Sequence, residues 1–340
     1  MAVALQSNVP LAGHTTLKVG GTAELFTTVT TTDGLLEALA YANANHKSVV
    51  ILGGGSNTLV LDTGVSGLVI KIAIEGITVT DEESGVLVTA GAGVLFDALV
   101  AMCVQEGLWG LENLSSIPGT VGATPVQNVG AYGVEVGDLI SAVHVYDTQE
   151  KKFTTLTRSE CQFGYRDSLF KHEVGRFIVT EVTYALSRVP QRRLSYKDLT
   201  LWFTDEPEPS LAAIRAAVTA IREQKFPDWH VVGTAGSFFK NPVVSHEQGM
   251  LLRSQYPELP LFPAAGQGMK VALGWILEHV LKVKGIRDGN VGTYAGQALV
   301  LVAYDGATAS EVDAFAHTLE RDVYDRTRIT IEREVTICGA

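Results

Sequence analysis

Apolar and polar residues follow one another along this chain with two different periods, which predicts a mixture of helices and strands. Apolar residues recur at helical spacing in five segments: 33–46, 94–107, 211–226, 271–280 and 310–327. Asp33 is the expected N-cap of the first helix, and Gly107 ends the second. The third ends before Pro227, because the residue preceding a proline disfavours helical geometry.

Short runs of β-branched residues predict strands in the intervals between these helices. A buried strand at 48–56 ends in glycines, two more at 67–72 and 77–93 follow, and the alternation over 139–187 indicates an antiparallel meander. Further strands are expected at 298–304 and 329–339, with Glu332 and Glu334 on one face of the last. Residues 188–210 contain three prolines and are expected to be a linker or a mobile loop.

Composition limits the class of protein. A chain of 340 residues, 46% hydrophobic and 19% charged, predicts a well-buried protein of two or three domains. A net charge of -11 without a basic stripe argues against nucleic-acid binding. We expect no membrane span, since no apolar run reaches about 18 residues. The N-terminal sequence lacks a secretory signal pattern, and Cys103, Cys161 and Cys338 are isolated, so we expect reduced thiols, a cytoplasmic protein and no metal site.

Two segments rich in glycine and amide side chains carry the first candidate chemistry. Residues 110–138 contain Gly119, Gly122, Gly130 and Gly133 with little charge, and residues 53–57 read GGGSN after a predicted strand. Glycine permits close approach, and converging backbone N–H groups bind phosphate oxygens, so residues 110–138 predict a cofactor loop. On the residues alone, GGGSN fits a plain loop at least as well as a phosphate-binding loop. The GAG at 91–93 lacks the third glycine of a Rossmann fingerprint, and the chain has no P-loop.

Three polar residues are candidates for catalysis. Ser237 stands in GTAGSFFKNP (233–242) beside two phenylalanines and lacks the GxSxG context of a hydrolase nucleophile, so we expect it to act as a general acid. Arg166, in GYRDSLFK (164–171), is suited to clamp an anion. The third, Glu334, is on the residues alone more typical of an exposed strand face, and Glu332 is the competing carboxylate.

These motifs, taken together and in order from residue 15 to residue 339, resemble those of the UDP-N-acetylenolpyruvoylglucosamine reductase family. The resemblance implies an α+β protein with a vanillyl-alcohol-oxidase-type FAD-binding fold of two subdomains and a C-terminal α+β substrate-binding domain. The implied boundaries are 1–70 for the first subdomain, to which a strand at about 330–340 returns, 71–225 for the second, including the mobile loop 188–210, and 226–329 for the substrate domain.

The resemblance also implies non-covalent FAD. It implies that GGGSN binds the pyrophosphate and that residues 16–21 and 117–133 wrap the rest. The expected FAD contacts are Gly53, Gly54, Gly55, Ser56, Asn57, Ile117, Pro118, Gly119, Thr120, Gly122, Ala123, Gln127, Asn128, Gly130, Ala131 and Tyr132.

The implied reaction is the NADPH-dependent reduction of UDP-N-acetylglucosamine enolpyruvate to UDP-N-acetylmuramate, in peptidoglycan precursor synthesis. Hydride would pass from flavin N5 to C3, and Ser237 would protonate C2, with Arg166 and Glu334 stabilising the developing charge. The expected substrate contacts are Tyr165, Lys225, Asn241, Lys284, Gln297 and, on the covering loop, Tyr196. Thr124 and Tyr294 depart from the residues usual in the family, and Thr124 is expected to alter flavin contacts slightly.

Two other classes of protein remain open. One is an oxidase or dehydrogenase of the same flavin fold that acts on an alcohol or a hydroxy acid. The other is a non-catalytic module that binds a nucleotide sugar, which would have no need of a long glycine-rich flavin wrap. For the favoured function, we expect a monomer whose partners are the enolpyruvyl substrate and NADPH.

Overall fold

The computed structural model describes residues 3–264, 266 and 268–339. The chain divides into two compact units, each assembled from three separate stretches of sequence. Unit 1 comprises Met1–Val9, Ala23–Gly55 and Ser66–Arg222, and unit 2 comprises Pro10–Thr22, Ser56–Val65 and Glu223–Ala340. Over the residues that the model describes, no helix is both long and apolar enough to cross a membrane.

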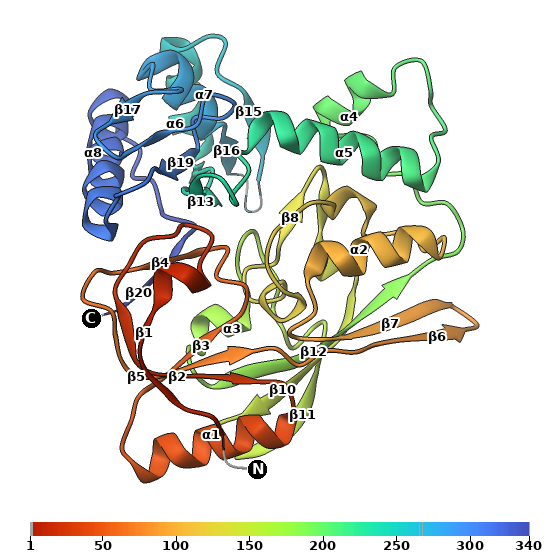
Figure 1. The fold of residues 1–340 in the computed structure, drawn as a ribbon. Coiled ribbons are helices and arrows are strands. Elements are labelled where there is room, and N and C mark those ends of the chain that lie inside the picture. The colour runs from red at the N-terminus through yellow and green to blue at the C-terminus, as the bar shows by residue number, and fades with distance from the viewer. Residues whose placement is uncertain (1–2, 265, 267, 340) are drawn as a thin grey trace. The chain divides into compact units, whose positions relative to one another are not determined.

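Unit 1 is built on two main sheets (Figure 1). The first has the order β1-β2-β5-β3, formed by Gln6–Pro10, Thr22–Val29, Val65–Ile72 and Val49–Leu52. The second has the order β11-β10-β12-β7-β6, formed by Lys152–Thr157, Ile140–Asp147, Phe177–Leu186, Gly85–Gly91 and Ile77–Glu82. All neighbours in the second sheet are antiparallel, as predicted for residues 139–187, but the predicted meander is wrong, because β12 pairs with β10 rather than with β11. A small hairpin, β8 (Gly130–Ala131) with β9 (Val134–Glu135), lies within the glycine-rich segment 110–138.

The helices of unit 1 are α1 (Thr32–Ala44), α2 (Phe96–Gln105), α3 (Leu169–His172), α4 (Lys197–Trp202) and α5 (Leu211–Lys225). The periodic pattern predicted α1, α2 and α5. The predicted cap of α1 is wrong, because the Thr31 side chain accepts the Gly34 N–H while Asp33 lies inside the first turn. The interpretation of 188–210 as wholly irregular is also wrong, since α4 lies within it.

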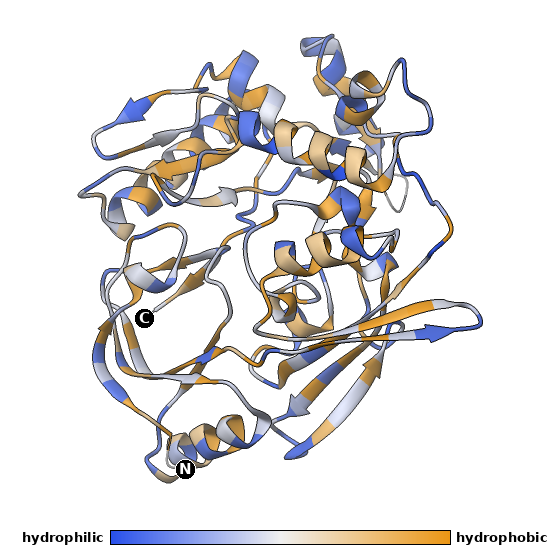
Figure 2. Ribbon diagram, turned by 45° about the vertical axis from the view of Figure 1, so that its right-hand side comes forward, coloured by the Kyte–Doolittle hydropathy of each residue, from blue (hydrophilic) through white to orange (hydrophobic). Residues whose placement is uncertain are grey.

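The core of unit 1 follows from the alternation of side chains. On β10, Val143 and Val145 are fully buried while their neighbours face outward, and Figure 2 shows blue and orange segments alternating along the strands of this sheet. A second cluster forms where α5 buries Ile214, Val218 and Ile221 against Trp109 and Tyr132. Burying one such aliphatic side chain stabilises the fold by about 1.5–3 kcal/mol.

Unit 2 has a four-stranded sheet, a three-stranded sheet and a two-stranded parallel pair. The strands of the first, in the order β13-β19-β18-β17, are Gly233–Ser237, Val300–Ala303, Val291–Thr293 and Arg287–Asp288. The strands of the second, in the order β14-β16-β15, are Val243–Val244, Met269–Val271 and Leu261–Pro263. The parallel pair joins β4 (Thr58–Val60) to β20 (Thr336–Cys338).

The helices of unit 2 are α6 (His246–Gln255), α7 (Leu273–Trp275), continued by a π-helix at Ile276–Val280, and α8 (Ala309–Thr327). The last two were predicted, whereas α6 was not, because its polar sequence has a weak apolar pattern. Helix α8 begins with a capping box between Thr308 and Glu311. The Asp62 carboxylate also accepts hydrogen bonds from its first amides, at 2.9 Å from Ala309 N and 2.8 Å from Ser310 N.

The predicted strand at 329–339 is wrong over most of its length, and only β20 is a strand. Residues 329–335 share a single isolated bridge with the rest of the protein, between Arg333 and Phe239. Their odd-numbered side chains, Ile329, Ile331 and Val335, are buried in the core of unit 2. The alternation that suggested a strand therefore records packing into the core rather than a continuous ladder.

Candidate active site

In unit 1 the glycine loop after β3 contacts the segment around Thr120. A Cβ added at Gly54 would lie 2.8 Å from Gly119 Cα, and one at Gly53 would lie 2.7 Å from Thr120 Oγ1. Gly55 has a φ of 62°, in the left-handed region that favours glycine. The structure thus brings together two segments that the sequence marked as cofactor loops. It also shows that Gly53 and Gly54 are needed for these loops to contact each other.

The same segment contains backbone strain. Ser116, Asn128 and Tyr132 have φ values of 59°, 46° and 47°, and such conformations cost a non-glycine residue about 1–2 kcal/mol. Strained residues persist where their surroundings hold them, and they cluster at functional sites. Three such residues within one short segment indicate that the surrounding structure holds its backbone in a defined conformation, as is typical of a functional site.

Ser116 is held by charged side chains from two helices. Its N–H donates to Asp97 Oδ1 at 2.5 Å, and its carbonyl accepts from Arg222 Nε at 3.1 Å. Asp97, on α2, also forms a bidentate pair with Arg215 of α5, at 2.7 and 2.9 Å. Burial works against the charged carboxylate, but the hydrogen bonds from Arg215 and Ser116 outweigh it and lower the pKa of Asp97. No sequence signal indicated this network, because its members are far apart along the chain.

Asn128 and Thr124, both expected near the flavin, use their side chains inside the protein. Asn128 Nδ2 donates to Glu135 Oε2 at 2.8 Å and to the Gly164 carbonyl at 2.9 Å, and its Oδ1 accepts the Gly137 N–H. Thr124 Oγ1 lies 2.8 Å from both the Val121 carbonyl and the Tyr184 hydroxyl. The Thr124 hydroxyl thus faces the core.

Two threonine hydroxyls in or beside the expected cofactor segments are buried without a partner. Among the residues described, the buried side-chain atoms that lack a hydrogen bond are Thr15 Oγ1, Asn113 Oδ1 and Thr120 Oγ1. Leaving such a group unsatisfied costs about 1–3 kcal/mol. Thr120 belongs to unit 1 and contacts the glycine loop, and Thr15 belongs to unit 2, directly before residues 16–21. Little charge, glycine-rich backbone and orphan hydroxyls suit a cofactor such as FAD, whose isoalloxazine is polar and neutral and whose pyrophosphate accepts hydrogen bonds from backbone N–H groups.

Arg166 contacts the glycine-rich segment directly. Its Nη2 donates to the Gly130 carbonyl at 2.5 Å, and its guanidinium carbon lies 5.5 Å from the centre of the Tyr165 ring. The residue is half-buried with a φ of 53°, and Lys171 Nζ donates to its carbonyl at 2.8 Å.

The segment 188–210 is fastened to the glycine-rich segment. The rings of Tyr196 and Tyr132 meet edge to face, with centroids 5.2 Å apart. Asn113 Nδ2 donates to the carbonyls of Tyr132 and Arg193, each at 2.8 Å. Burial raises the pKa of the Tyr132 phenol to about 12. Tyr196, expected to cover a substrate, is therefore connected to the expected cofactor segment within unit 1.

Unit 2 brings Ser237 and Glu334 together although 97 positions of sequence separate them. Ser237 ends β13, after Gly236 with a φ of 73°. The Glu334 N–H donates to the carbonyl of Phe238 at 2.8 Å, and the Lys240 N–H donates to the carbonyl of Glu332 at 2.9 Å. The proposed acid and the proposed carboxylate thus lie on two adjoining backbone segments.

The environments of the two candidate glutamates differ. The Glu332 side chain is 73% exposed and forms an ion pair with Lys240 at 3.0 Å, whereas Glu334 is half-buried. Asn57 Nδ2 also donates to the Glu334 carbonyl at 3.0 Å, and the Asn57 carbonyl accepts the Thr336 N–H. The last residue of GGGSN therefore helps to hold the segment that carries Glu334, a role that the sequence did not predict. These contacts favour Glu334 over Glu332.

Two of the expected substrate residues of unit 2, Asn241 and Gln297, lie beside the start of α7. Asn241 Oδ1 accepts the Leu273 N–H at 3.0 Å, and Gln297 Oε1 lies 3.0 Å from a Cβ added at Gly274. A Cβ at Gly296 would lie 2.1 Å from the Gln224 carbonyl, so the residues before Gln297 and Lys225 are in contact. Lys284 instead forms an ion pair with Glu278 at 2.9 Å.

Comparison with known proteins bears on these sites. A family model described as an FAD binding domain matches residues 23–155, and a model described as the C-terminal domain of UDP-N-acetylenolpyruvoylglucosamine reductase matches 227–338. The chain is 40% identical over 336 residues to the UDP-N-acetylenolpyruvoylglucosamine reductase of Pseudomonas aeruginosa, covering 98% of this chain and 99% of the relative. It is 39% identical over 333 residues to the enzyme of the same name from Polynucleobacter asymbioticus, covering 98% and 96%.

A solved structure agrees over the whole chain. The crystal structure of UDP-N-acetylenolpyruvylglucosamine reductase from Thermus caldophilus superposes with a TM-score of 0.70 at 26% identity, covering 99% of this chain and 100% of that one. The predicted fold class, an α+β protein with an FAD-binding fold and a C-terminal domain, is thereby confirmed.

Proposed function

Because this chain belongs to the UDP-N-acetylenolpyruvoylglucosamine reductase family, we propose that it reduces UDP-N-acetylglucosamine enolpyruvate to UDP-N-acetylmuramate with NADPH as the source of electrons. The chain is an FAD-dependent oxidoreductase of peptidoglycan precursor synthesis. The observation that supports the more detailed proposal is the hydrogen bond from Glu334 N to the carbonyl of Phe238, the residue after Ser237, which joins the two backbone segments within unit 2.

We assign the proposed FAD contacts of each unit separately. In unit 1 these are the glycine loop 53–55 and residues 117–132, where the orphan hydroxyl of Thr120 is a donor for the cofactor. In unit 2 they are Ser56, Asn57 and residues 15–21. Bound FAD supplies the two-electron chemistry, with NADPH as the reductant and C3 of the enolpyruvyl group as the acceptor.

Side chains of the protein supply the proton for C2 and stabilise the negative charge that forms on the substrate. Reduction at C3 leaves negative charge at C2 and on the adjacent carboxylate, and Ser237 donates its hydroxyl proton to C2, which completes the lactyl ether. We assign the stabilisation of that charge to Arg166 and Glu334, since preorganised groups around a developing charge are often the largest catalytic contribution. Tyr165, Lys225, Asn241, Lys284, Gln297 and Tyr196 are proposed to hold the UDP-sugar.

The proposal extends to the organisation of the protein. We propose two FAD-binding subdomains, 1–70 and 71–225, and a substrate domain, 226–329. The pairing of β20 with β4 supports the expected return of the C-terminal segment to the early part of the chain. We also propose that the protein acts as a monomer in the cytoplasm.

An anaerobic absorbance titration tests the proposed reaction. The purified protein is expected to be yellow, to bleach with one equivalent of NADPH, and to regain its colour when UDP-N-acetylglucosamine enolpyruvate is added. A protein that bleaches and stays bleached would exclude this substrate, and reoxidation by simple alcohols or hydroxy acids would favour an oxidase of the same fold. A colourless protein that cannot take up FAD would favour the nucleotide-sugar binding module.

A further inference from the structure

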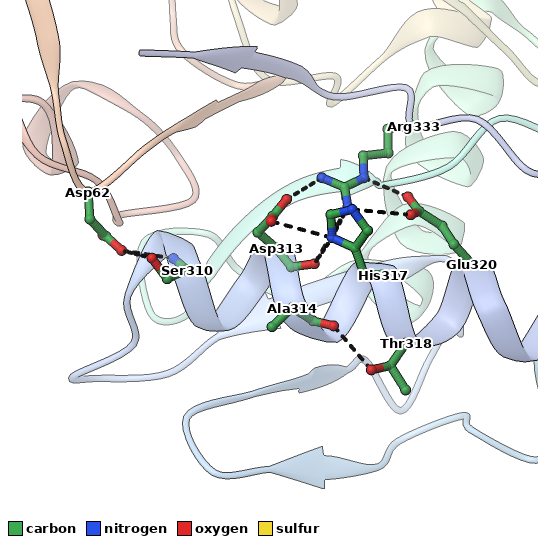
Figure 3. A network of polar contacts seen from close by, with 8 residues as sticks. All are labelled: Asp62, Ser310, Asp313, Ala314, His317, Thr318, Glu320 and Arg333. Atoms are coloured by element: carbon green, nitrogen blue, oxygen red, sulfur yellow. Dashed lines mark hydrogen bonds and ion pairs between the residues drawn. The ribbon is translucent and has the colours of Figure 1, made fainter. Parts of the chain in front are cut away.

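Arg333, directly before Glu334, forms a cluster of charged contacts with one face of α8 (Figure 3). Its Nε donates to Glu320 Oε1 at 2.6 Å, its Nη1 donates to the Asp313 carboxylate, and its Nη2 lies 2.9 Å from His317 Nδ1. Asp313, His317 and Glu320 are spaced i, i+4 and i+7, so a single helix face presents all three. We call Arg333, Asp313 and Glu320 the clamp.

The clamp is well shielded from solvent for a charged group. The Arg333 side chain is 12% exposed, and those of Asp313 and Glu320 are 32% and 26% exposed. Arg333 occupies the position in the 329, 331, 333, 335 alternation where its neighbours bury apolar side chains. The hydrogen bonds to Glu320 and Asp313 outweigh the cost of burial and raise the pKa of its guanidinium. A shielded, doubly bonded guanidinium has little freedom to move.

The clamp bears on both proposed catalytic residues. Arg333 forms the isolated bridge with Phe239, and the flanking hydrogen bonds run from Glu334 N to Phe238 O and from Lys240 N to Glu332 O. Its guanidinium carbon also lies 5.8 Å from the centre of the Phe238 ring, next to Ser237. In an extended segment successive side chains point to opposite sides. Drawing Arg333 to α8 therefore fixes the side to which Glu334 points.

We propose that Arg333, held by Asp313 and Glu320, is a positioning residue that sets the placement of Glu334 relative to Ser237. The role of Glu334 rests on the proposed function. The placement of its backbone does not, so the two can be tested apart.

The test compares Arg333→Met and Arg333→Lys with Arg321→Met, in which an arginine of α8 that is 67% exposed is lost. We expect Arg333→Met to accelerate amide hydrogen exchange at Glu334 while the amide of Val302 in β19 keeps its rate. We expect it to slow reoxidation by the enolpyruvyl UDP-sugar about 10- to 100-fold, the scale of a small misplacement, and to leave reduction by NADPH within about twofold. Arg333→Lys should be intermediate, and Arg321→Met should match the wild type.

Several results would overturn the proposal. One is wild-type exchange at Glu334, and another is equal acceleration at Glu334 and Val302, which would mean general destabilisation. Equal slowing of flavin reduction and flavin reoxidation in Arg333→Met would also overturn the proposal. Should the wild-type protein fail to be reoxidised by the enolpyruvyl sugar, the proposed function fails, while the exchange rates still decide the role of the clamp. If Arg333→Met does not fold, Glu320→Gln should show the same pattern at a smaller scale, and unchanged exchange at Glu334 in that variant would overturn the proposal.

Discussion

At the scale of single residues, the two threonines at 120 and 124 make opposite use of the same side chain. Thr120 Oγ1 is buried without a partner, whereas Thr124 Oγ1 is bonded to Val121 and Tyr184. A buried hydroxyl without a partner destabilises the protein until something binds it. The pair therefore separates a position that we assign to the cofactor from one that serves the fold.

Thr120→Val tests this assignment, because valine keeps the shape and removes the hydroxyl. We expect the FAD-free protein to be unchanged or more stable by up to about 1 kcal/mol, and its affinity for FAD to fall about 2- to 10-fold, the range for one neutral hydrogen bond. Urea unfolding of the apoprotein and FAD titration measure the two effects. The control, Thr124→Val, should show the reverse, with a loss of stability and little change in FAD affinity. If Thr120→Val destabilises the apoprotein, its hydroxyl has a partner in the protein.

Ser237→Ala tests the proposed general acid. Reduction of the flavin by NADPH should stay near the wild-type rate, since no proton from Ser237 is needed there. Reoxidation by the enolpyruvyl sugar should slow about 100-fold or more, the scale of one lost general acid. Stopped-flow absorbance follows each half-reaction, and Ser254→Ala on the exposed part of α6 is the control. Equal slowing of both half-reactions would make Ser237 structural.

Residue types were easier to predict from the sequence than residue partners. The motifs pointed to Ser237, Arg166 and Glu334. They did not reveal that Asn57 holds the Glu334 carbonyl, or that Asn128 uses its amide on Glu135 and Gly164. Such bonds join positions far apart along the chain, and a single sequence contains no record of distance. The glycines show the same limit, since the approach that Gly54 permits is an approach of Gly119.

At the scale of elements, the loop 188–210 is held by the hydrogen bond from Asn113 to the Arg193 carbonyl, and its Tyr196 ring packs edge to face against the Tyr132 ring. Changing Tyr196 to Phe keeps this ring contact and removes only the hydroxyl. We expect KM for the UDP-sugar to rise about 2- to 10-fold, the range for one neutral hydrogen bond, with KM for NADPH unchanged. Steady-state kinetics with each substrate varied measures both. A KM for the UDP-sugar equal to that of the wild type would remove the hydroxyl from substrate binding.

The ion pair between Asp97 of α2 and Arg215 of α5 predicts how the stability of the protein depends on pH. The pKa of the Asp97 carboxyl is lower in the folded protein than in the unfolded chain. Its ionised form therefore adds to the free energy of unfolding above the unfolded-chain pKa of about 4, and this stabilisation is lost as the pH falls through the lower pKa of the folded protein. Asp97→Asn should reduce the free energy of unfolding by about 1–2 kcal/mol near pH 7, from weakened hydrogen bonds to Arg215 and Ser116. The difference from wild type should stay constant between pH 5 and 8 and narrow below about pH 4.

Urea unfolding at several pH values measures this difference. Asp81→Asn is the matched control, because Asp81 pairs with Arg188 at an exposed position and surface pairs contribute little. A difference for Asp97→Asn that widens as the pH falls would contradict the assignment.

Helices in which apolar residues recur at helical spacing were predictable from the sequence. Strands, which depend on hydrogen bonds to a neighbouring strand, were less so. Helices α1, α2, α5 and α8 appear where the period placed them, because each buries one face. The strand expected at 329–339 is reduced to β20, since alternation reports which side chains are buried and does not report whether a neighbouring backbone is present. The cap of α1 is Thr31 rather than Asp33 because Thr31, two residues earlier, is also a suitable cap.

At the scale of the whole molecule, the division into two units explains why the domain order could not be read along the chain. Each unit takes stretches from early and late parts of the sequence. Composition changes little at the boundaries near residues 10, 22, 55 and 65, so no linker signal marks them. The family resemblance, which concerns the order of motifs, was a better guide to the fold than any local change of composition.

The parallel pairing of β4 with β20 limits the order in which parts of the chain can fold during synthesis on the ribosome. All of unit 1 has been made once Arg222 is added, whereas β4 waits for a partner that begins at Thr336. At about 5–20 residues per second, that wait lasts roughly 15 to 60 seconds. Unit 1 can close around its core during this interval, while β4 still lacks its partner strand. The neighbourhood of Ser237 and Glu334 is consequently among the last parts of the nascent protein to form.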